Sequence, residues 1–456
     1  MDIALSPPKK KRSQDQGITA ISVTGYKSLV EEQPIEIRPL TILAGANGSG
    51  KSSAMQPLLL LKQTLEASYD PGYLLLDGPN IRFTSADQFL SKIPGNPSAT
   101  RFRVSVQVDA AQTLTLVFRR QENRGIELVE MWHQSENGDT ILKPEMSHDE
   151  IVANVPDTVA FQQRFTELGS ATEKDPFQGW KWAVDRNRCF LSLSLNMSEK
   201  DNRMGSLGGI INPANPFESH IRHIIHVPGL RGNPTRTYRA TAVGADFPGT
   251  FENYVASVIS NWQQHQDDRL SELGVMLEML GLTWKVETRQ IDDTQVELRV
   301  GRLTHGERGG ARDMVSIADV GFGLSQILPV LAALLTARPG QVVYLEQPEI
   351  HLHPKAQSAL AKVLVDAANK DVRVIAETHS SLLLLSIQTL VAEQQIATDK
   401  VKLHWFKRRE DGVTTISSAD LDQAGAYGNW PEDFADVALD TESRYLNAAE
   451  QHPEPR

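Results

Sequence analysis

The residues Gly45-Ala46-Asn47-Gly48-Ser49-Gly50-Lys51-Ser52 decide how this chain folds, because they match Gly-x-x-x-x-Gly-Lys-Ser/Thr at every fixed position. An apolar run from Leu40 to Ala44 precedes them and predicts a buried strand, and the residues from Met55 to Leu65 favour a helix. The N-terminus of such a helix and the N–H groups of a glycine-rich loop both attract anions. The sequence therefore predicts a phosphate-binding loop within an α/β fold.

The positions of this loop suggest how it would hold a nucleotide. Lys51 would reach the β- and γ-phosphates, and the Ser52 hydroxyl would bind Mg²⁺. The predicted binding residues are Gly45, Ala46, Asn47, Gly48, Ser49, Gly50, Lys51, Ser52 and Ser53. Kinases, GTPases and ATPases share such a loop, so other motifs must separate these classes.

A second buried strand, Val342 to Leu345, is followed by Glu346 at the edge where open α/β sheets bind their ligands. A carboxylate there can hold the Mg²⁺ shell. Glu346 lies 346 − 51 = 295 residues beyond Lys51, farther than simple kinases or GTPases usually allow. Guanine specificity is also disfavoured, since Asn369-Lys370-Asp371 has its acid one place too early for Asn-Lys-x-Asp.

Two more segments offer groups for a phosphate. The glycine-containing turn from Asp319 to Gln326 enters an apolar helix, so it provides a second helix start that attracts anions. A third buried strand, Val372 to Ala376, ends in Glu377-Thr378-His379-Ser380. His379 could donate a hydrogen bond to a γ-phosphate at the same edge of the sheet.

Together these motifs resemble the ABC-type ATPase heads of the SMC, RecF and overcoming-lysogenization-defect lineages. The resemblance is carried by Tyr26-Lys27-Ser28, Asn47 to Ser52, Leu345 to Pro354 and Glu377 to Ser380. The segment from Gly428 to Phe434 is similar to that of a group of bacterial AAA-like ATPases with a C-terminal Trp-Pro segment and no Toprim domain. The resemblance implies ATP, Mg²⁺ and head-to-head dimers, in which the signature turn of one subunit caps the nucleotide of the other.

The resemblance also implies roles for single residues. Glu346 takes the place of the Mg²⁺-shell acid and His379 that of the switch histidine. The signature turn corresponds to Gly321, Gly323, Ser325 and Gln326.

Gln347 departs from the family pattern, because ABC heads usually have a glutamate here that orients or deprotonates the attacking water. An amide can orient water but cannot accept its proton. Glu349, two residues further on, is a spare carboxylate. We therefore expect slow ATP hydrolysis with Glu349 or solvent as the base. The alternative is a protein that uses ATP mainly to hold a dimer together.

The spacing of the motifs predicts five regions. They are a basic tail at 1–16, the N-terminal part of an ATPase head at 17–134, a compact α+β insertion at 135–310, the C-terminal part of the head at 311–410, and a Trp-Pro segment with an acidic tail at 411–456. Residues 101–108, 113–119 and 126–132 alternate like an antiparallel meander. Without a sustained heptad repeat, a long coiled-coil arm is excluded. The expected fold is thus a P-loop ABC-type head, with a parallel sheet and an antiparallel β subdomain.

One segment of the chain, from His220 to Arg239, is rich in basic residues and histidines. Its arginines Arg222, Arg231, Arg236 and Arg239 could contact nucleic-acid phosphates or a protein partner. The alternative is a salt-bridged connector on the surface of the head. A metal site is disfavoured, since the histidines have no nearby acid.

Composition limits the class of protein and the cellular compartment that the sequence can indicate. Lysines and arginines number 46 against 57 aspartates and glutamates, and the net charge of −11 excludes a uniformly basic protein that coats nucleic acid. A single cysteine, Cys189, excludes a disulfide framework and is typical of the reducing cytosol. The apolar stretches are shorter than the roughly 18 residues of a membrane-spanning helix, so we expect no membrane contact and a cytoplasmic location.

These observations lead to one main functional hypothesis and two alternatives. The hypothesis is an ATP-dependent switch that forms a homodimer or higher oligomer and senses nucleic acid or controls a separately encoded effector, such as a nuclease, in anti-phage defence. The alternatives are a scaffold that binds ATP without hydrolysing it and a DNA-repair ATPase of the RecF type.

Overall fold

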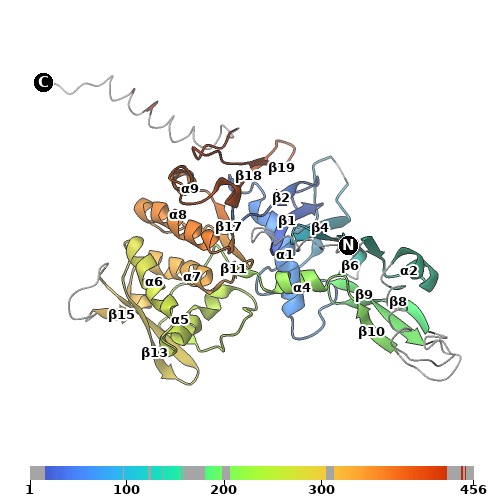
Figure 1. The fold of residues 1–456 in the computed structure, drawn as a ribbon, viewed down its shortest axis with the longest axis horizontal. Coiled ribbons are helices and arrows are strands. Elements are labelled where there is room, and N and C mark those ends of the chain that lie inside the picture. Colours follow the sequence, from blue (N-terminus) through green and yellow to red (C-terminus); the bar gives the residue numbers. More distant parts are fainter. Residues whose placement is uncertain are drawn as a thin grey trace, which may run out of the picture.

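The computed structural model of this chain describes residues 16–95, 97–121, 125–136, 138–155, 158, 180–197, 206–303, 313–428, 443–444 and 447. Figure 1 shows a central sheet with helices on both sides and smaller β regions to either side of it. Residues 429–434 of the predicted Trp-Pro segment and nearly all of the predicted basic tail lie outside the described residues.

A six-stranded sheet in the order β11-β16-β17-β3-β18-β19 forms the centre of the molecule. Its strands are β11 (Ile225–Val227), β16 (Val342–Glu346), β17 (Arg373–Thr378), β3 (Leu40–Gly45), β18 (Val401–Arg408) and β19 (Thr414–Ala419). The first five run parallel, and β19 is antiparallel to β18. The parallel strands β3, β16 and β17 are nearly continuous apolar runs because helices cover both of their faces.

The phosphate loop connects β3 to α1 (Lys51–Glu66), which packs on one face of the central sheet. Side chains at alternate strand positions, including Leu43, Tyr344 and Ile375, share a hydrophobic cluster with α1. Their neighbours in sequence belong to a second cluster on the other face, formed with the remaining helices. These helices are α5 (Val255–Gln264), α6 (Asp268–Met279), α7 (Phe322–Thr336), α8 (Pro354–Asn369) and α9 (Ser381–Ala392).

A second, antiparallel sheet has six strands in the order β2-β1-β4-β5-β6-β7. They are β2 (Pro34–Glu36), β1 (Ile18–Thr24), β4 (Arg101–Val108), β5 (Gln112–Gln121), β6 (Gly125–Ser135) and β7 (Gly138–Leu142). Strands β4 to β6 form the meander that the alternating sequence predicts, with one face buried. Together with the central sheet and its phosphate loop, this sheet confirms the predicted α/β P-loop fold.

The predicted insertion at 135–310 does not form one compact unit. Its first part holds α2 (His148–Asn154), the three-stranded sheet β8 (Trp180–Asn187), β9 (Phe190–Met197) and β10 (Ser206–Ile211), and α4 (Asn215–Arg222). Its last part holds α5, α6 and the strands β12 (Tyr238–Arg239), β13 (Val286–Asp292) and β14 (Gln295–Gly301), which β15 (Met314–Ser316) joins. Between the two parts, β11 pairs in parallel with β16 and so belongs to the central sheet. Its three residues are fully buried, which explains this placement.

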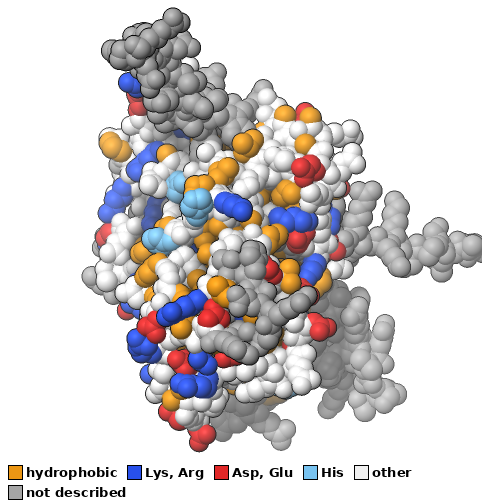
Figure 2. All heavy atoms as spheres, turned by 90° about the vertical axis from the view of Figure 1, so that its left-hand side faces the viewer, with side chains coloured by type: hydrophobic (Ala, Val, Ile, Leu, Met, Phe, Trp, Pro, Cys, Tyr) orange, Lys and Arg blue, Asp and Glu red, His pale blue; other side chains and the backbone are white. Residues whose placement is uncertain are grey.

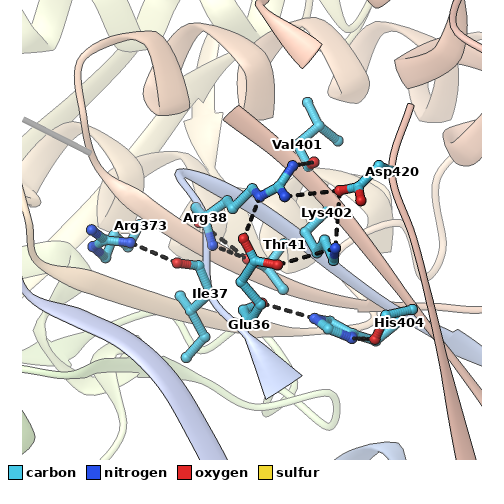
Figure 3. A network of polar contacts seen from close by, with 10 residues as sticks. Glu36, Ile37, Arg38, Thr41, Arg373, Val401, Lys402, His404 and Asp420 are labelled. Atoms are coloured by element: carbon cyan, nitrogen blue, oxygen red, sulfur yellow. Dashed lines mark hydrogen bonds and ion pairs between the residues drawn. The ribbon is translucent and has the colours of Figure 1, made fainter. Parts of the chain in front are cut away.

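The N-terminal ends of β3 and β18 are joined by a group of polar side chains, Glu36, Arg38, Lys402, His404 and Asp420, that we call the base network (Figure 3). Arg38 Nε lies 2.7 Å from Glu36 Oε1, and Lys402 Nζ lies 3.0 Å from Glu36 Oε2. Both cations also pair with Asp420 Oδ1, at 2.8 and 2.9 Å. The buried His404 contacts the Glu36 carbonyl through Nε2 at 2.8 Å. Each charge in the base network is therefore balanced by a neighbour.

None of the described helices is long and apolar enough to cross a membrane.

Candidate nucleotide-binding site

The phosphate loop is shaped by glycines with positive φ angles. Gly45, Gly48 and Gly50 have φ angles of 144°, 73° and 104°. A Cβ atom at Gly45 would lie 2.3 Å from the Phe406 carbonyl oxygen, so only glycine fits there. From β19, Thr414 Oγ1 donates a hydrogen bond of 2.7 Å to the Ser49 carbonyl. The strands on this side of β3 thus hold the loop in place.

The first two residues of α1 make the polar contacts expected of a phosphate loop. Lys51 Nζ donates to the carbonyl oxygens of Gly45 and Ala46, at 2.9 Å each. Burial lowers the pKa of Lys51, while the charges of Glu377 and Glu349 act in the opposite direction. Ser52 Oγ donates a hydrogen bond of 2.7 Å to Glu377 Oε2. The hydroxyl expected to bind Mg²⁺ therefore already contacts a carboxylate.

A polar cavity of about 530 Å³ opens over the loop and brings three distant segments together. Its lining includes Asn47, Gly48, Gly50, Lys51, Ser52 and Ser53 from the loop and α1, with Gln347, Glu377 and His379 from the ends of β16 and β17. Lys27 and Arg408 add positive charge to the same cavity. The cavity can accept an anionic ligand. Glu346 and Glu349 are not part of this lining.

Glu346, the expected Mg²⁺-shell acid, turns toward β11. Its Oε1 lies 3.1 Å from His226 Nε2, and its Oε2 accepts a 3.0 Å hydrogen bond from the Gly229 N–H. Burial raises the pKa of Glu346, but these two contacts outweigh it and hold the pKa below its usual value. The ring of His226 in turn stacks on Tyr344, with centroids 5.4 Å apart. Both carboxylate oxygens of Glu346 thus have partners on the side of β11.

Glu377 was part of a motif in the sequence, yet the sequence assigned it no role. Its Oε1 accepts a hydrogen bond from the Tyr344 hydroxyl, and its Oε2 accepts one from Ser52. The side chain is 2% exposed. Burial and the nearby charge of Glu346 raise the pKa of Glu377 to about 7, although Tyr344, Ser52 and Lys51 act against this shift. The signal in the sequence was its position at the end of a buried strand.

Gln347 and Glu349 occupy different environments although they are two residues apart. Gln347 lines the cavity, has a φ of 46°, and its N–H donates to the Glu377 carbonyl at 2.9 Å. Glu349 is buried, and its Oε1 accepts hydrogen bonds from Thr378 Oγ1 at 2.6 Å and from the His379 N–H at 3.1 Å. Glu349 thus holds the start of the switch segment through Thr378 and His379, and its role as the base stays a prediction.

His379 is half-buried and lines the same cavity as the phosphate loop. Burial and the charge of Lys51 lower the pKa of His379, which keeps its ring neutral near pH 7. A neutral imidazole can still donate one hydrogen bond to a phosphate oxygen.

The signature turn is only partly accessible. Gly321 is exposed and precedes α7, and Ser325 Oγ donates 2.9 Å to the Phe322 carbonyl near the surface. A Cβ atom at Gly323 would come within 3.0 Å of the His351 carbonyl. Gln326 is buried, and its amide lies 3.3 Å from the Gly232 carbonyl. Gly321 and Ser325 can therefore meet a partner subunit, whereas Gln326 packs within its own chain.

The four arginines proposed for nucleic acid do not form one surface. Arg231 is 7% exposed, and its guanidinium donates at 2.9 Å to the carbonyls of Gln326 and Glu346. Burial lowers the pKa of Arg231 to about 10. The burial of Arg231 and the bonds from its two terminal nitrogens to carbonyl groups disfavour a nucleic-acid contact by this residue.

The other three arginines lie nearer the surface. Arg236 forms a bidentate pair with Asp319 at 2.7 and 3.0 Å, Arg222 pairs with Glu218 along α4, and Arg239 is exposed. Figure 2 shows the side of the molecule where α6 and α8 lie, with side chains of both charges and hydrophobic ones interspersed. The described residues on that face do not form the continuous basic band that nucleic-acid binding favours.

A comparison with protein-family models finds a match over most of the chain. A family model described as "AAA domain, putative AbiEii toxin, Type IV TA system" matches residues 40–386. Among solved structures, an SMC head bound to the C-winged helix domain of ScpA is 12% identical over 90% of this chain and 99% of its own, with a TM-score of 0.44.

Two further SMC heads show similarly low identity. The SMC head domain from Thermotoga maritima is 12% identical over 88% of this chain and 98% of its own, with a TM-score of 0.36. An Smc head with an extended coiled coil, bound to the C-terminal domain of ScpA derived from Pyrococcus furiosus, is 11% identical over 95% and 99%, with a TM-score of 0.39. No curated protein sequence matches this chain.

Proposed function

The chain belongs to this AAA-domain family, and from that premise we propose that it binds ATP with Mg²⁺ in the cavity over the phosphate loop, hydrolyses it slowly and uses it to join two copies of itself. The observation that carries the proposal is the meeting of Lys51, Ser52, Gln347 and His379 around one cavity, since these residues come from three separate segments. Each supplies a group that phosphoryl transfer requires.

The chain's own groups suggest how the reaction would proceed. Lys51 would exchange its two carbonyl acceptors for phosphate oxygens, and His379 would donate to the γ-phosphate. When bound, Mg²⁺ would neutralise the charge that develops on the phosphates. Ser52 would help to hold this ion, and the amide of Gln347 would orient water.

Hydrolysis would be slow because position 347, where ABC heads usually have a glutamate, holds an amide that cannot accept a proton. Both oxygens of Glu346 and the Oε1 atom of Glu349 are engaged by other groups. We therefore propose solvent as the final proton acceptor. An amide that only orients the water forgoes the gain from general-base catalysis, which is about 100-fold or more.

The binding proposal is tested with Lys51→Ala. The substitution removes the charge that would face the β- and γ-phosphates, so ATP affinity should fall by about 100-fold or more in calorimetry. Lys402→Ala is the matched control, since Lys402 is also buried but lies at the other end of the sheet. Lys402→Ala should lower stability and leave ATP affinity unchanged. Unchanged affinity in Lys51→Ala would refute the nucleotide site.

Self-association is proposed from the accessible part of the signature turn, Gly321 and Ser325. With Mg²⁺-ATP the mass in sedimentation experiments should rise to that of a dimer or larger oligomer. Ser325→Arg places a bulky cation where the partner's nucleotide would approach, and it should prevent this rise without reducing ATP binding to the chain's own cavity. An ATP-dependent mass increase in Ser325→Arg would contradict the pairing through this turn.

The biological role is proposed from the family, whose description names a toxin of a type IV toxin–antitoxin system. We propose that the ATP-bound dimer controls a separately encoded effector, such as a nuclease, in anti-phage defence. Nucleic acid remains a candidate trigger, though the burial of Arg231 weakens the surface first proposed for it. Stimulation of ATP turnover by DNA alone would instead favour a repair ATPase of the RecF type.

A further inference from the structure

The order of strands places Glu377 closer to the phosphate loop than Glu346. β17 lies directly beside β3, whereas β16 is one strand further away. In the register of the sheet, Glu377 pairs with Leu43 on β3 and with Glu346 on β16. Ser52, in the first turn of α1, contacts Glu377 at the end of β17. The strand order therefore brings Ser52 within reach of Glu377.

The contacts of the two carboxylates agree with this order. Glu377 Oε2 lies 2.7 Å from Ser52 Oγ, the hydroxyl expected to bind Mg²⁺. Glu346 contacts His226 Nε2 and the Gly229 N–H with its two oxygens. Glu377 lines the cavity, and Glu346 does not. Of the two carboxylates, Glu377 is thus the one that contacts the Ser52 hydroxyl and lines the cavity.

The distribution of charged side chains also favours a cation beside Glu377. Glu346 and Glu377 occupy paired positions on neighbouring strands, so two carboxylates approach each other at a largely buried edge. The nearest cationic side chain on the loop, Lys51, donates to carbonyl oxygens. A hard divalent cation with oxygen ligands would offset the repulsion, and Mg²⁺ prefers carboxylate, hydroxyl and water ligands.

We propose that Glu377, and not Glu346, is the carboxylate that completes the Mg²⁺ shell of the ATP site, directly or through a bound water. The proposal rests on the nucleotide site proposed for this chain. Glu346 is then a positioning residue, which ties the end of β16 to β11 through His226. The hydroxyl of Tyr344 donates to Oε1 of Glu377 and so orients Oε2 toward Ser52.

The experiment compares ATP affinity in Mg²⁺ with ATP affinity in EDTA for the full chain and for Glu377→Gln and Glu346→Gln. These variants form a matched pair, because each replaces a carboxylate by an amide of the same shape on neighbouring strands. Glu377→Gln should lose most of the affinity gained from Mg²⁺, about 10-fold or more, while its affinity in EDTA stays the same or rises. Glu346→Gln should keep the gain from Mg²⁺.

Binding of Mn²⁺ in place of Mg²⁺ provides a readout that does not depend on turnover. With ATP present, the electron paramagnetic resonance signal of bound Mn²⁺ should be lost or altered in Glu377→Gln and preserved in Glu346→Gln. If Glu377→Gln fails to fold, Glu377→Asp keeps the charge but withdraws the oxygens by one methylene. That variant should still lose part of the Mg²⁺ gain, and a full gain would overturn the proposal.

The outcomes separate this proposal from the proposed function. If the unaltered chain binds ATP neither with Mg²⁺ nor in EDTA, the nucleotide site itself is refuted. If it binds ATP and the Mg²⁺ gain disappears in Glu346→Gln but survives in Glu377→Gln, only the assignment of Glu377 is overturned.

Discussion

At the N-terminal ends of β3 and β18, Glu36 lies between Arg38 and Lys402, whereas at the C-terminal ends of β16 and β17 the carboxylates of Glu346 and Glu377 are neighbours. The first arrangement pairs each anion with a cation of the same chain (Figure 3). The second leaves negative charge in excess around the Ser52 hydroxyl. Both border the central sheet, at its opposite edges, so the difference does not come from the fold class.

The two arrangements indicate two different roles for buried charges, one in folding stability and one in ligand binding. Where the cations belong to the chain, as in the base network, the ion pairs join strands and contribute to folding. Where the counter-charge is missing from the chain, the site can gain binding energy from a cation that arrives with a ligand. We therefore expect substitutions at the two ends to act on different quantities, namely stability at the base network and ligand binding at the cavity.

Of the two predictions that compare these regions, the larger effect is expected at Glu349. It tests whether the carboxylate of Glu349 supports stability, as in the base network, or takes part in the reaction at the cavity. Its Oε1 accepts from Thr378 and His379, so Glu349→Ala should lower ATP turnover by about 10-fold or more and reduce stability, because two buried donors lose their acceptor. Glu349→Gln keeps an acceptor oxygen and should retain turnover within about threefold. Steady-state phosphate release and thermal melting measure both quantities.

A general base at Glu349 would give a different pattern. Both variants would then lose about 100-fold in turnover, since neither alanine nor glutamine accepts a proton. Glu349 would in that case be a catalytic residue. Its substitution would then act mainly on ATP turnover, whereas substitutions in the base network act on stability.

A smaller effect is expected at the base network, in the dependence of stability on pH. Burial lowers the pKa of His404 to about 4, and the charge of Lys402 adds to this shift, although the contact with Glu36 acts against it. An unfolded histidine has a pKa of about 6.5, so the unfolded state binds the extra proton between these values. The free energy of unfolding should therefore fall by about 3 kcal/mol as the pH drops from 6.5 to 4.

The variant His404→Gln isolates this contribution. Glutamine can donate to the Glu36 carbonyl and accept from Ser418, which are the contacts of the imidazole, but it does not titrate. Denaturant unfolding at several pH values should give a shallower decline for His404→Gln than for the unaltered chain. If the free energy of unfolding declines equally with falling pH in both proteins, His404 is not the source of the pH dependence. ATP affinity should be the same in both.

Local patterns account for what could be predicted from the sequence. The phosphate loop has fixed spacing within eight residues, and the meander from β4 to β6 follows from simple alternation. Continuous apolar runs also predicted β3, β16 and β17. These features depend on neighbours in the chain, so the residues alone were sufficient.

The rest depended on contacts between distant segments. The orientation of Glu346 is set by His226, 120 residues earlier, on a three-residue strand too short to show a pattern. Arg231 looked like an exposed cation, because nothing in its neighbourhood in sequence indicated the buried carbonyls that it satisfies. Glu377 was visible, but its place beside Ser52 follows from strand order, which no local motif encodes.

Arg231 also has a consequence for communication between subunits. One guanidinium joins α7, through the Gln326 carbonyl, to the turn that carries Gln347, through the carbonyls of Glu346 and Gln347. In the proposed head-to-head pair, α7 of each chain would contact the nucleotide of the other chain. A movement of α7 would then displace Arg231, and through it the turn that carries Gln347 in the same chain. Occupancy of one site would then alter the other, so the pair would respond to ATP cooperatively rather than as two independent halves.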